Sequence, residues 1–155
     1  MRTAVPVLVL LATSTVAHAA SITTLASFNW ANGSNPEAGL IADGGGNLFG
    51  TTEQGGASGQ GTVFEIAKTA SGYASTPTTL ASFNGTNGAA PYGGLIAGSQ
   101  GNLFGTTFYG GASTAYGGAS GQGTVFEIAK TASGYASAPT TLARFNGTNG
   151  ALTPA

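Results

Sequence analysis

The chain reads Asn47-Leu48-Phe49-Gly50-Thr51-Thr52, then Gly55-Gly56, then Gly61-Thr62-Val63-Phe64-Glu65-Ile66. The same stretches return later in the chain, at residues 102–107, 110–111 and 123–128. The similarity extends well beyond them, because residues 59–83 recur with few changes at residues 121–145. A period of this length is typical of repeat architectures, in which every repeat forms one structural unit. The sequence therefore predicts at least two copies of the same unit.

The repeated stretches are β-prone runs separated by glycine-rich turns. Val63, Glu65 and Ala67 alternate with Phe64, Ile66 and Lys68, so Phe64 and Ile66 fall on one face of a strand and Glu65 on the other. Aromatic and β-branched residues recur at fixed places, which favours a packed sheet over disordered low complexity for a chain with 27 glycines. The sequence predicts strands at residues 22–28, 39–42, 47–52, 62–67, 78–83, 94–97, 102–107, 124–129 and 140–145.

The first 19 residues have the features of a secretory signal peptide. Arg2 supplies a positive charge, residues 5–12 form a short apolar segment, and Ala17-His18-Ala19 matches a signal-peptidase site. The apolar segment is much shorter than the ~20 residues that a membrane-spanning helix needs. We therefore expect cleavage after Ala19, an exported protein, and no membrane anchor in this chain.

The composition after residue 19 excludes several classes of function. The chain has no cysteine, and its single histidine, His18, belongs to the expected signal peptide. Zinc and the usual transition-metal sites are therefore not expected, and neither is a histidine-activated nucleophile. A mildly acidic and sparsely charged surface does not fit nucleic-acid binding. We expect no cofactor, no metal and no nucleic-acid partner.

Four short strands in each unit are typical of a propeller blade. Pro91-Tyr92-Gly93-Gly94-Leu95-Ile96, followed by the run at residues 101–107, the pair Gly110-Gly111 and the run at residues 123–126, resembles the GloVer tandem repeat of exported bacterial proteins. The order of elements is also similar to kelch blades. The resemblance covers nearly all of residues 23–150. It implies an exported, β-propeller-like array, often tethered by a C-terminal sorting signal, and it implies no defined activity.

The fold predicted from these features is all-β, with two four-stranded propeller-like blades plus flanking strands, an incomplete β-propeller. The units are placed at about residues 23–77 and 78–139, with a partial third unit at residues 140–155. The run expected after Gly150 is replaced by residues 151–155, and no sorting tail follows. Two blades cannot close a ring of at least four. We therefore expect a fragment, a truncated product, or a homo-oligomer that assembles through its incomplete blade edges.

The expected core consists of large apolar side chains at matching positions of the two units. We predict that these residues form the buried faces of the sheets: Phe49, Phe64, Ile66, Phe83, Phe104, Phe126, Ile128 and Phe145.

Carboxylates offer little support for catalysis. Glu65 and Glu127 occupy the same strand position in successive units, where their separation is expected to exceed the ~5 to 9.5 Å of a glycosidase pair. Solvent-facing strand charges are the simpler interpretation. Asp43, before three glycines, is interpreted as an Asx-type turn, because a calcium site needs six to eight oxygens. The sequence identifies no catalytic residue.

Aromatic residues that differ between the units are the remaining candidates for ligand contact. Glu37 is replaced by Tyr92, and the dipeptide at residues 53–54 is replaced by aromatics. Loop aromatics of this kind stack on sugars or anchor partner proteins, and they also pack between blades. The candidate ligand-contact residues are Trp30, Tyr92, Phe108, Tyr109 and Tyr116.

The function expected from the sequence is that of an exported, non-enzymatic repeat protein, a binding or structural module outside the cell or in its envelope. Its expected partners are proteins or carbohydrates at the cell surface. The alternative is a fragment of a secreted carbohydrate-active enzyme or of a sugar-binding protein.

Overall fold

A computed structural model describes residues 21–111, 122–146 and 148–149. The expected signal peptide at residues 1–19 and the chain end at residues 150–155 lie outside the described residues. Every regular element within them is a strand. The all-β prediction is therefore confirmed.

The first sheet, called sheet one, consists of four antiparallel strands in the order β1-β2-β3-β6. Their bounds are Ile41–Ala42 (β1), Leu48–Thr52 (β2), Thr62–Ile66 (β3) and Thr78–Ser82 (β6). A small hairpin of β4 (Lys68–Thr69) and β5 (Gly72–Tyr73) extends from the connection between β3 and β6. In it, the Lys68 ammonium lies 4.3 Å from the centre of the Tyr73 ring.

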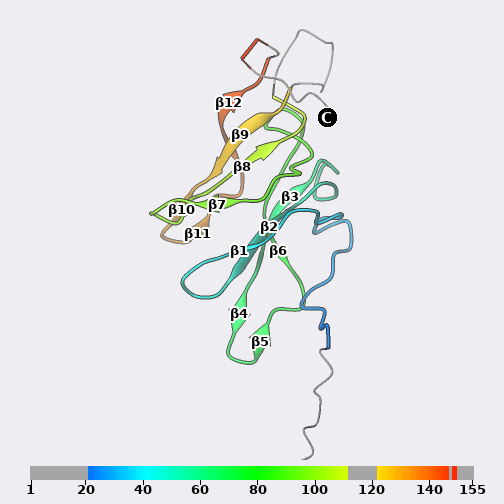
Figure 1. The fold of residues 1–155 in the computed structure, drawn as a ribbon, viewed down its shortest axis with the longest axis vertical. Coiled ribbons are helices and arrows are strands. Elements are labelled where there is room, and N and C mark those ends of the chain that lie inside the picture. Colours follow the sequence, from blue (N-terminus) through cyan, green and yellow to red (C-terminus); the bar gives the residue numbers. More distant parts are fainter. Residues whose placement is uncertain (1–20, 112–121, 147, 150–155) are drawn as a thin grey trace, which may run out of the picture.

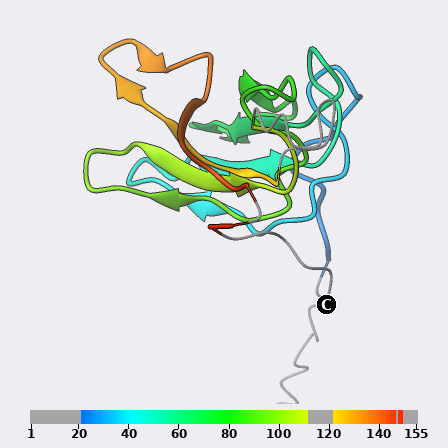
Figure 2. The ribbon, with the colours of Figure 1, turned by 90° about the horizontal axis from the view of Figure 1, so that it is seen from above.

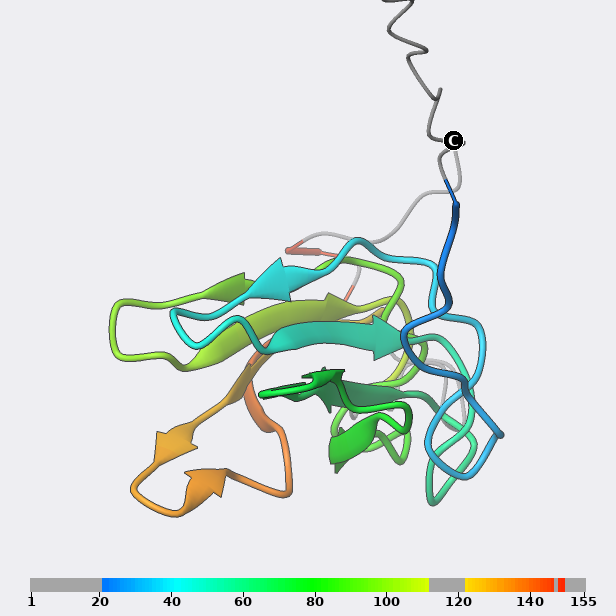
Figure 3. The same ribbon diagram turned by 90° about the horizontal axis from the view of Figure 1, so that it is seen from below.

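Sheet two repeats this arrangement in the second unit, with the order β7-β8-β9-β12. Its strands are Ile96–Ala97 (β7), Leu103–Thr107 (β8), Thr124–Ile128 (β9) and Thr140–Arg144 (β12). The matching hairpin consists of β10 (Lys130–Thr131) and β11 (Gly134–Tyr135). Figure 1 shows sheet two beyond sheet one along the long axis of the molecule. Figures 2 and 3, viewed along that axis, show the strands of one sheet lying over those of the other.

The two flanking strands differ from the prediction. Residues 21–29 form no strand, and this segment instead places Phe28 edge-on against Phe64, with ring centres 4.8 Å apart. The other flanking run, β12, pairs with β9 and completes sheet two. Likewise, β6 belongs to sheet one although it opens the second unit of the sequence. Each sheet therefore takes its last strand from the start of the following repeat.

Register divides the side chains of each sheet between two faces, because paired residues in an antiparallel sheet share a face and neighbours along a strand alternate. The face called the front face is defined in sheet one by Ile41, Phe49, Thr51, Val63 and Ala81. In sheet two it is defined by Ile96, Phe104, Thr106, Val125 and Ala143. Phe64 and Ile66, and in sheet two Phe126 and Ile128, lie on the opposite back faces.

The back face of each sheet is covered by the segment that precedes it in the chain. We call residues 28–40 and 83–95 the first and second cover. Phe83 of the second cover lies edge-on against Phe126, with ring centres 4.9 Å apart, as Phe28 of the first cover does against Phe64. The front face of sheet one then packs on the second cover. The two sheets and the second cover share one apolar core: Phe49, Val63, Ala81, Phe83, Leu95, Leu103, Phe126 and Ile128.

Most of the predicted core residues are buried, and two are not. Six of them are at most 5 % exposed: Phe49, Phe64, Ile66, Phe83, Phe126 and Ile128. Phe104 and Phe145 are only half-buried. Phe104 lies on the front face of sheet two, where the described residues provide no further sheet. Its counterpart Phe49 is buried because the second cover lies on it.

The face that carries Glu65 was expected to be solvent-facing, and this expectation is wrong for sheet one. Glu65 shares that face with Phe49 and Val63, which are 1 % and 0 % exposed. The alternation itself is confirmed, but stacking buries both faces of this sheet. Glu65 remains half-buried on a face that is mostly apolar.

Candidate ligand-contact site

The candidate site lies along the edge of the sheets at which strands β2 and β8 end. In each sheet a pair of threonines positions the loop that follows. In sheet one, the Thr52 and Thr62 hydroxyls are 2.8 Å apart, and Thr52 Oγ1 also donates to the Gln54 carbonyl oxygen at 2.9 Å. Thr107 and Thr124 repeat the pair in sheet two, again at 2.8 Å. The second unit forms the same hydrogen bonds, so the hydroxyls of these repeated threonines bond within the scaffold.

The glycine pair lets this loop pass close to the preceding cover. Gly55 has a φ of +79°, and an added Cβ there would lie 2.8 Å from the Gly33 backbone. Gly110 has a φ of +83° and meets Gly88 in the same way. Only glycine fits such a contact without strain. The residues between the threonine and the glycine pair, 53–54 and 108–109, are then presented at the surface.

Three aromatic rings meet at these variable positions. Phe108 lies edge-on to both neighbouring tyrosines, with ring centres 5.4 Å from Tyr92 and 4.5 Å from Tyr109. Tyr92 is 41 % exposed and Tyr109 is 48 % exposed. We call these three residues the aromatic cluster. It offers two accessible phenol rings held by packing on a third, which is the kind of surface that stacks on sugars or on partner side chains.

A carboxylate completes the cluster, and the sequence did not identify it as part of the site. The Tyr92 hydroxyl donates to Glu53 Oε1 at 2.8 Å, and Asn35 Nδ2 donates to Glu53 Oε2 at 3.2 Å. These two bonds, the Tyr92 bond first, hold the pKa of Glu53 below its ordinary value. The same bond raises the pKa of the Tyr92 hydroxyl. The exchange of Glu53 for Phe108 between the units was visible in the sequence, but its contact with Tyr92 depends on how the units stack.

The contact between Tyr92 and Glu53 joins the second cover to the loop after sheet one. Packing between the units, one of the two alternatives for these aromatics, therefore applies to Tyr92. The outer surfaces of Tyr92 and Tyr109 stay accessible, so the ligand-contact alternative remains open for them. The two alternatives are compatible for Tyr92, because its hydroxyl is bonded while its ring is partly exposed.

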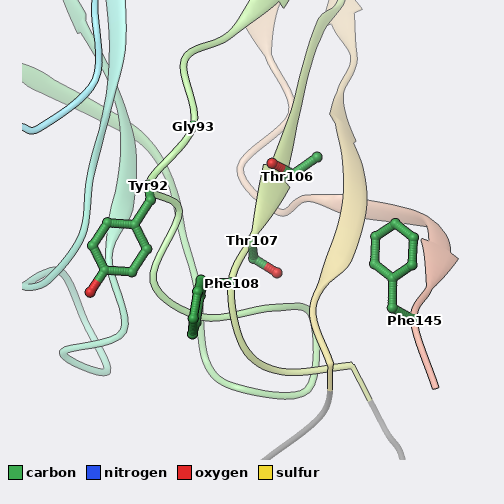
Figure 4. Close-up of a pocket in the computed structure, with 6 residues that line it drawn as sticks. All are labelled: Tyr92, Gly93, Thr106, Thr107, Phe108 and Phe145. Carbon is green, nitrogen blue, oxygen red and sulfur yellow. The ribbon is translucent and has the colours of Figure 1, made fainter. Parts of the chain in front are cut away.

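A hollow of about 290 Å³ lies beside the cluster, lined by Tyr92, Gly93, Thr106, Thr107, Phe108 and Phe145. Figure 4 shows Tyr92 and Phe108 on one side of it and Phe145 on the other, with the two threonines of β8 between them. The hollow extends from the cluster onto the front face of sheet two.

Of the other two candidate aromatics, the structure describes only Trp30, which does not join this cluster. Trp30 is 55 % exposed, has a φ of +69° and lies in the first cover, next to Gly59. Tyr116 lies outside the described residues. Only Tyr92, Phe108 and Tyr109 are brought together, because the loop after β8 and the second cover meet at the same end of sheet two.

The acidic positions are occupied by local structure. Asp43 accepts three hydrogen bonds of 2.9 Å, from Gly45 N, Asn47 N and Asn47 Nδ2, so the Asx-type turn is confirmed. Burial acts in the opposite direction, but these bonds hold the pKa of Asp43 below its ordinary value. Glu127 accepts a 2.6 Å bond from Asn102 Nδ2. Glu65 and Glu127 belong to different sheets of the stack.

Across the described residues, no group of three or more acidic, histidine or cysteine side chains is arranged to hold a metal ion. The same part of the chain contains no helix long and apolar enough to cross a membrane.

The fold and the site define an all-β repeat protein whose repeated side chains build the stack and whose variable side chains gather on its surface. The model of the Gloeobacter/Verrucomicrobia repeat matches residues 11–155. The chain therefore belongs to this repeat family, as the resemblance in its glycine-rich motifs implied. No curated protein and no solved structure matches the chain.

Proposed function

We propose that the chain is an exported, non-enzymatic repeat protein that acts as a binding or structural module outside the cell or in its envelope. The observation that carries this proposal is the separation of repeated from variable side chains. Repeated polar residues such as Thr52 and Thr62 bond within the scaffold. The variable residues Glu53, Tyr92 and Tyr109 gather at one accessible surface. Repeat proteins commonly bind through variable positions on an invariant scaffold.

The saturated polar interior supports a scaffold role. Within the described residues, every buried side-chain nitrogen or oxygen has a hydrogen-bond partner. An enzyme would be expected to keep an activated acid, base or nucleophile free at its site. The carboxylates of Asp43 and Glu127 are bonded to neighbouring asparagine amides instead.

A sugar-binding protein is the second candidate, and the aromatic cluster favours it. Two exposed phenol rings beside a carboxylate match the needs of a pyranose, whose faces stack on aromatic rings and whose hydroxyls donate to carboxylates. Cell-surface polysaccharide is therefore the carbohydrate partner that we propose. A carbohydrate-active enzyme is a further step that would require carboxylates outside the cluster.

The experiment measures binding of purified residues 20–155 to isolated envelope fractions and to soluble polysaccharides by affinity electrophoresis. We expect Tyr109→Ala to weaken binding at least tenfold, whereas Ile22→Ala, which removes a fully exposed apolar side chain outside the cluster, leaves it unchanged. Reducing ends are assayed on the same samples. Release of reducing ends that Glu65→Gln or Glu127→Gln abolishes would replace the proposal with an enzymatic function. Binding that Tyr109→Ala does not affect would rule out the cluster.

A further inference from the structure

We propose that the front face of sheet two binds the opposite end of a second copy of this chain, so that copies add head to tail. The two copies would meet in the same relative arrangement as sheet one and the second cover do within one chain. This inference concerns the stacking face and does not require a ligand at the aromatic cluster, although Thr106 of this face also lines the hollow beside the cluster.

The junction inside the chain is directional. The front face of sheet one meets the second cover, and the contacting surfaces are different from one another. Thr51 Oγ1 donates to the Gly93 carbonyl oxygen at 3.1 Å, and Ala90 N donates to the Gln60 carbonyl oxygen at 3.0 Å. The Phe49 ring lies 5.4 Å from the Tyr135 ring of the β10–β11 hairpin. Contacts between unlike surfaces can be repeated indefinitely, in contrast to a two-fold interface.

The front face of sheet two carries the same residue types in an exposed state. Ile96 is 68 % exposed, whereas its counterpart Ile41 packs against the core. Thr106 is exposed, whereas its counterpart Thr51 is 1 % exposed. Ala143 is exposed and Phe104 and Val125 are half-buried, whereas their counterparts Ala81, Phe49 and Val63 are at most 2 % exposed. Among the described residues, the front face of sheet two is thus a more exposed version of a surface that is buried in sheet one.

The matching surface lies at the other end of the stack, on the first cover. Leu40 is 48 % exposed, whereas its counterpart Leu95 in the second cover is 3 % exposed. Pro36 is exposed, whereas Pro91 is buried to below 2 % exposure. Tyr73 occupies the hairpin position from which Tyr135 contacts Phe49. The counterparts of the internal junction are therefore present at the two ends, and Leu40 and Pro36 are exposed there.

A second copy is the occupant that this surface fits. The internal junction demonstrates that these side chains pack together when they meet, since its core residues are almost completely buried. Exposed contiguous apolar surface is unfavourable and marks sites of association. In the joined state, Thr106 Oγ1 would donate to the partner's Ala38 carbonyl oxygen, which corresponds to Gly93. The partner's Leu40 would become buried as Leu95 is.

One segment of the second copy must move to complete the junction. Phe145 N donates to the Gly123 carbonyl oxygen at 3.0 Å, as Phe83 N does to Gly61 at 2.9 Å. The Asn146 side chain then accepts from Thr148 and Asn149, as Asn84 does from Thr86 and Asn87. The start of a third cover is therefore already in place. This segment, which starts at Phe145, lies where residues 28–32 of the second copy would have to pack. In the joined state it would stay in place, and residues 28–32 of the second copy would be displaced.

The test uses sedimentation velocity of residues 20–155 over a wide range of concentrations. The unmodified chain is expected to form a concentration-dependent series of dimers and longer assemblies. Thr106→Arg blocks the front face of sheet two, and Pro36→Arg blocks the first cover. Each variant alone is expected to be monomeric. Mixed together, they are expected to form a one-to-one dimer and nothing larger, because one free front face and one free cover remain. Ala132→Arg, at a position exposed in both units, is the matched control and assembles normally.

Several results would overturn the proposal. A monomeric unmodified chain would do so, and so would aggregation that Thr106→Arg leaves unchanged. A mixture of the two blocked variants that stays monomeric would show that the interface is not head to tail. Thermal melting by circular dichroism establishes that each variant is folded. Deletion of residues 21–32 removes the segment that must be displaced, so we expect faster assembly, and an unchanged rate would contradict the exchange.

Discussion

At the scale of single residues, the pair Glu53 and Tyr92 carries most of the chemistry that distinguishes the two units. Their hydrogen bond of 2.8 Å links the two repeats. The second unit has Phe108 at the position of Glu53, and this side chain contacts its neighbours only through its ring. A carboxylate whose folded-state pKa is lowered stabilises the fold above its unfolded pKa. That stabilisation is lost as the pH falls through the folded-state pKa. Acidification through the folded-state pKa of Glu53 should therefore weaken this link between the repeats.

The corresponding prediction concerns Tyr92→Phe. The substitution removes the largest cause of the shift while it keeps the ring, so the pKa of Glu53 should rise toward its ordinary value of 4.5. Titration of the side-chain carboxyl carbon by NMR measures this pKa directly. The pKa of Asp43, which depends on its own turn, serves as the control and should stay unchanged. A Glu53 pKa that does not move would show that the hydroxyl does not hold the carboxylate in solution.

At the scale of elements, β3 and β9 have the same five-residue sequence but different surroundings. Phe126 of β9 lies inside the core shared by both sheets and contacts the fully buried Phe83. Phe64 of β3 lies under the first cover and contacts Phe28, which is only half-buried. Phe126 is therefore enclosed by the core that both sheets share, whereas Phe64 is covered only by the first cover.

Truncation of these phenylalanines tests that difference. Phe126→Ala should destabilise the chain by ~3 to 5 kcal/mol, as is usual for a fully buried aromatic residue. Phe64→Ala should cost less, because the first cover can collapse into the space more easily than two packed sheets can. Denaturant unfolding monitored by circular dichroism gives both values. Unchanged midpoints for both variants would mean that the assignment of the back faces is wrong.

At the scale of the whole molecule, the stack has two different ends, and its core lies between them. Sheet one is buried on both faces, whereas sheet two is buried only on its back face among the described residues. Repeat proteins gain much of their stability from contacts between neighbouring units. A further unit packed on the front face of sheet two would therefore add to the stability of the stack.

Export is the prediction that concerns the chain as a whole. The charged start, the short apolar segment and the Ala17-His18-Ala19 site predict cleavage after Ala19. Expression of the full chain in a bacterial host, followed by intact-mass analysis of exported protein, measures the site. Exported material that retains Met1 would contradict the signal peptide.

Local sequence was sufficient for the strands and for the family. Alternation along residues 62–66 and glycine-rich turns act over a few positions, so their structural consequences can be predicted from the chain alone. The same holds for the Asx-type turn at Asp43, whose bonds all reach residues within four positions. Repetition of these local signals also predicted two similar four-stranded sheets.

Tertiary structure alone decided which faces are buried and which residues form the site. Phe49 and Phe104 have identical neighbours in sequence, yet only Phe49 is covered, because another unit packs on it. The expected strand at residues 22–28 does not form, and only its last residue, Phe28, packs on the back face of sheet one. Glu53 joined the aromatic cluster only through a contact across 39 positions of the chain. Burial and long-range contacts depend on the neighbouring unit, and no pattern within a single repeat encodes which neighbour is present.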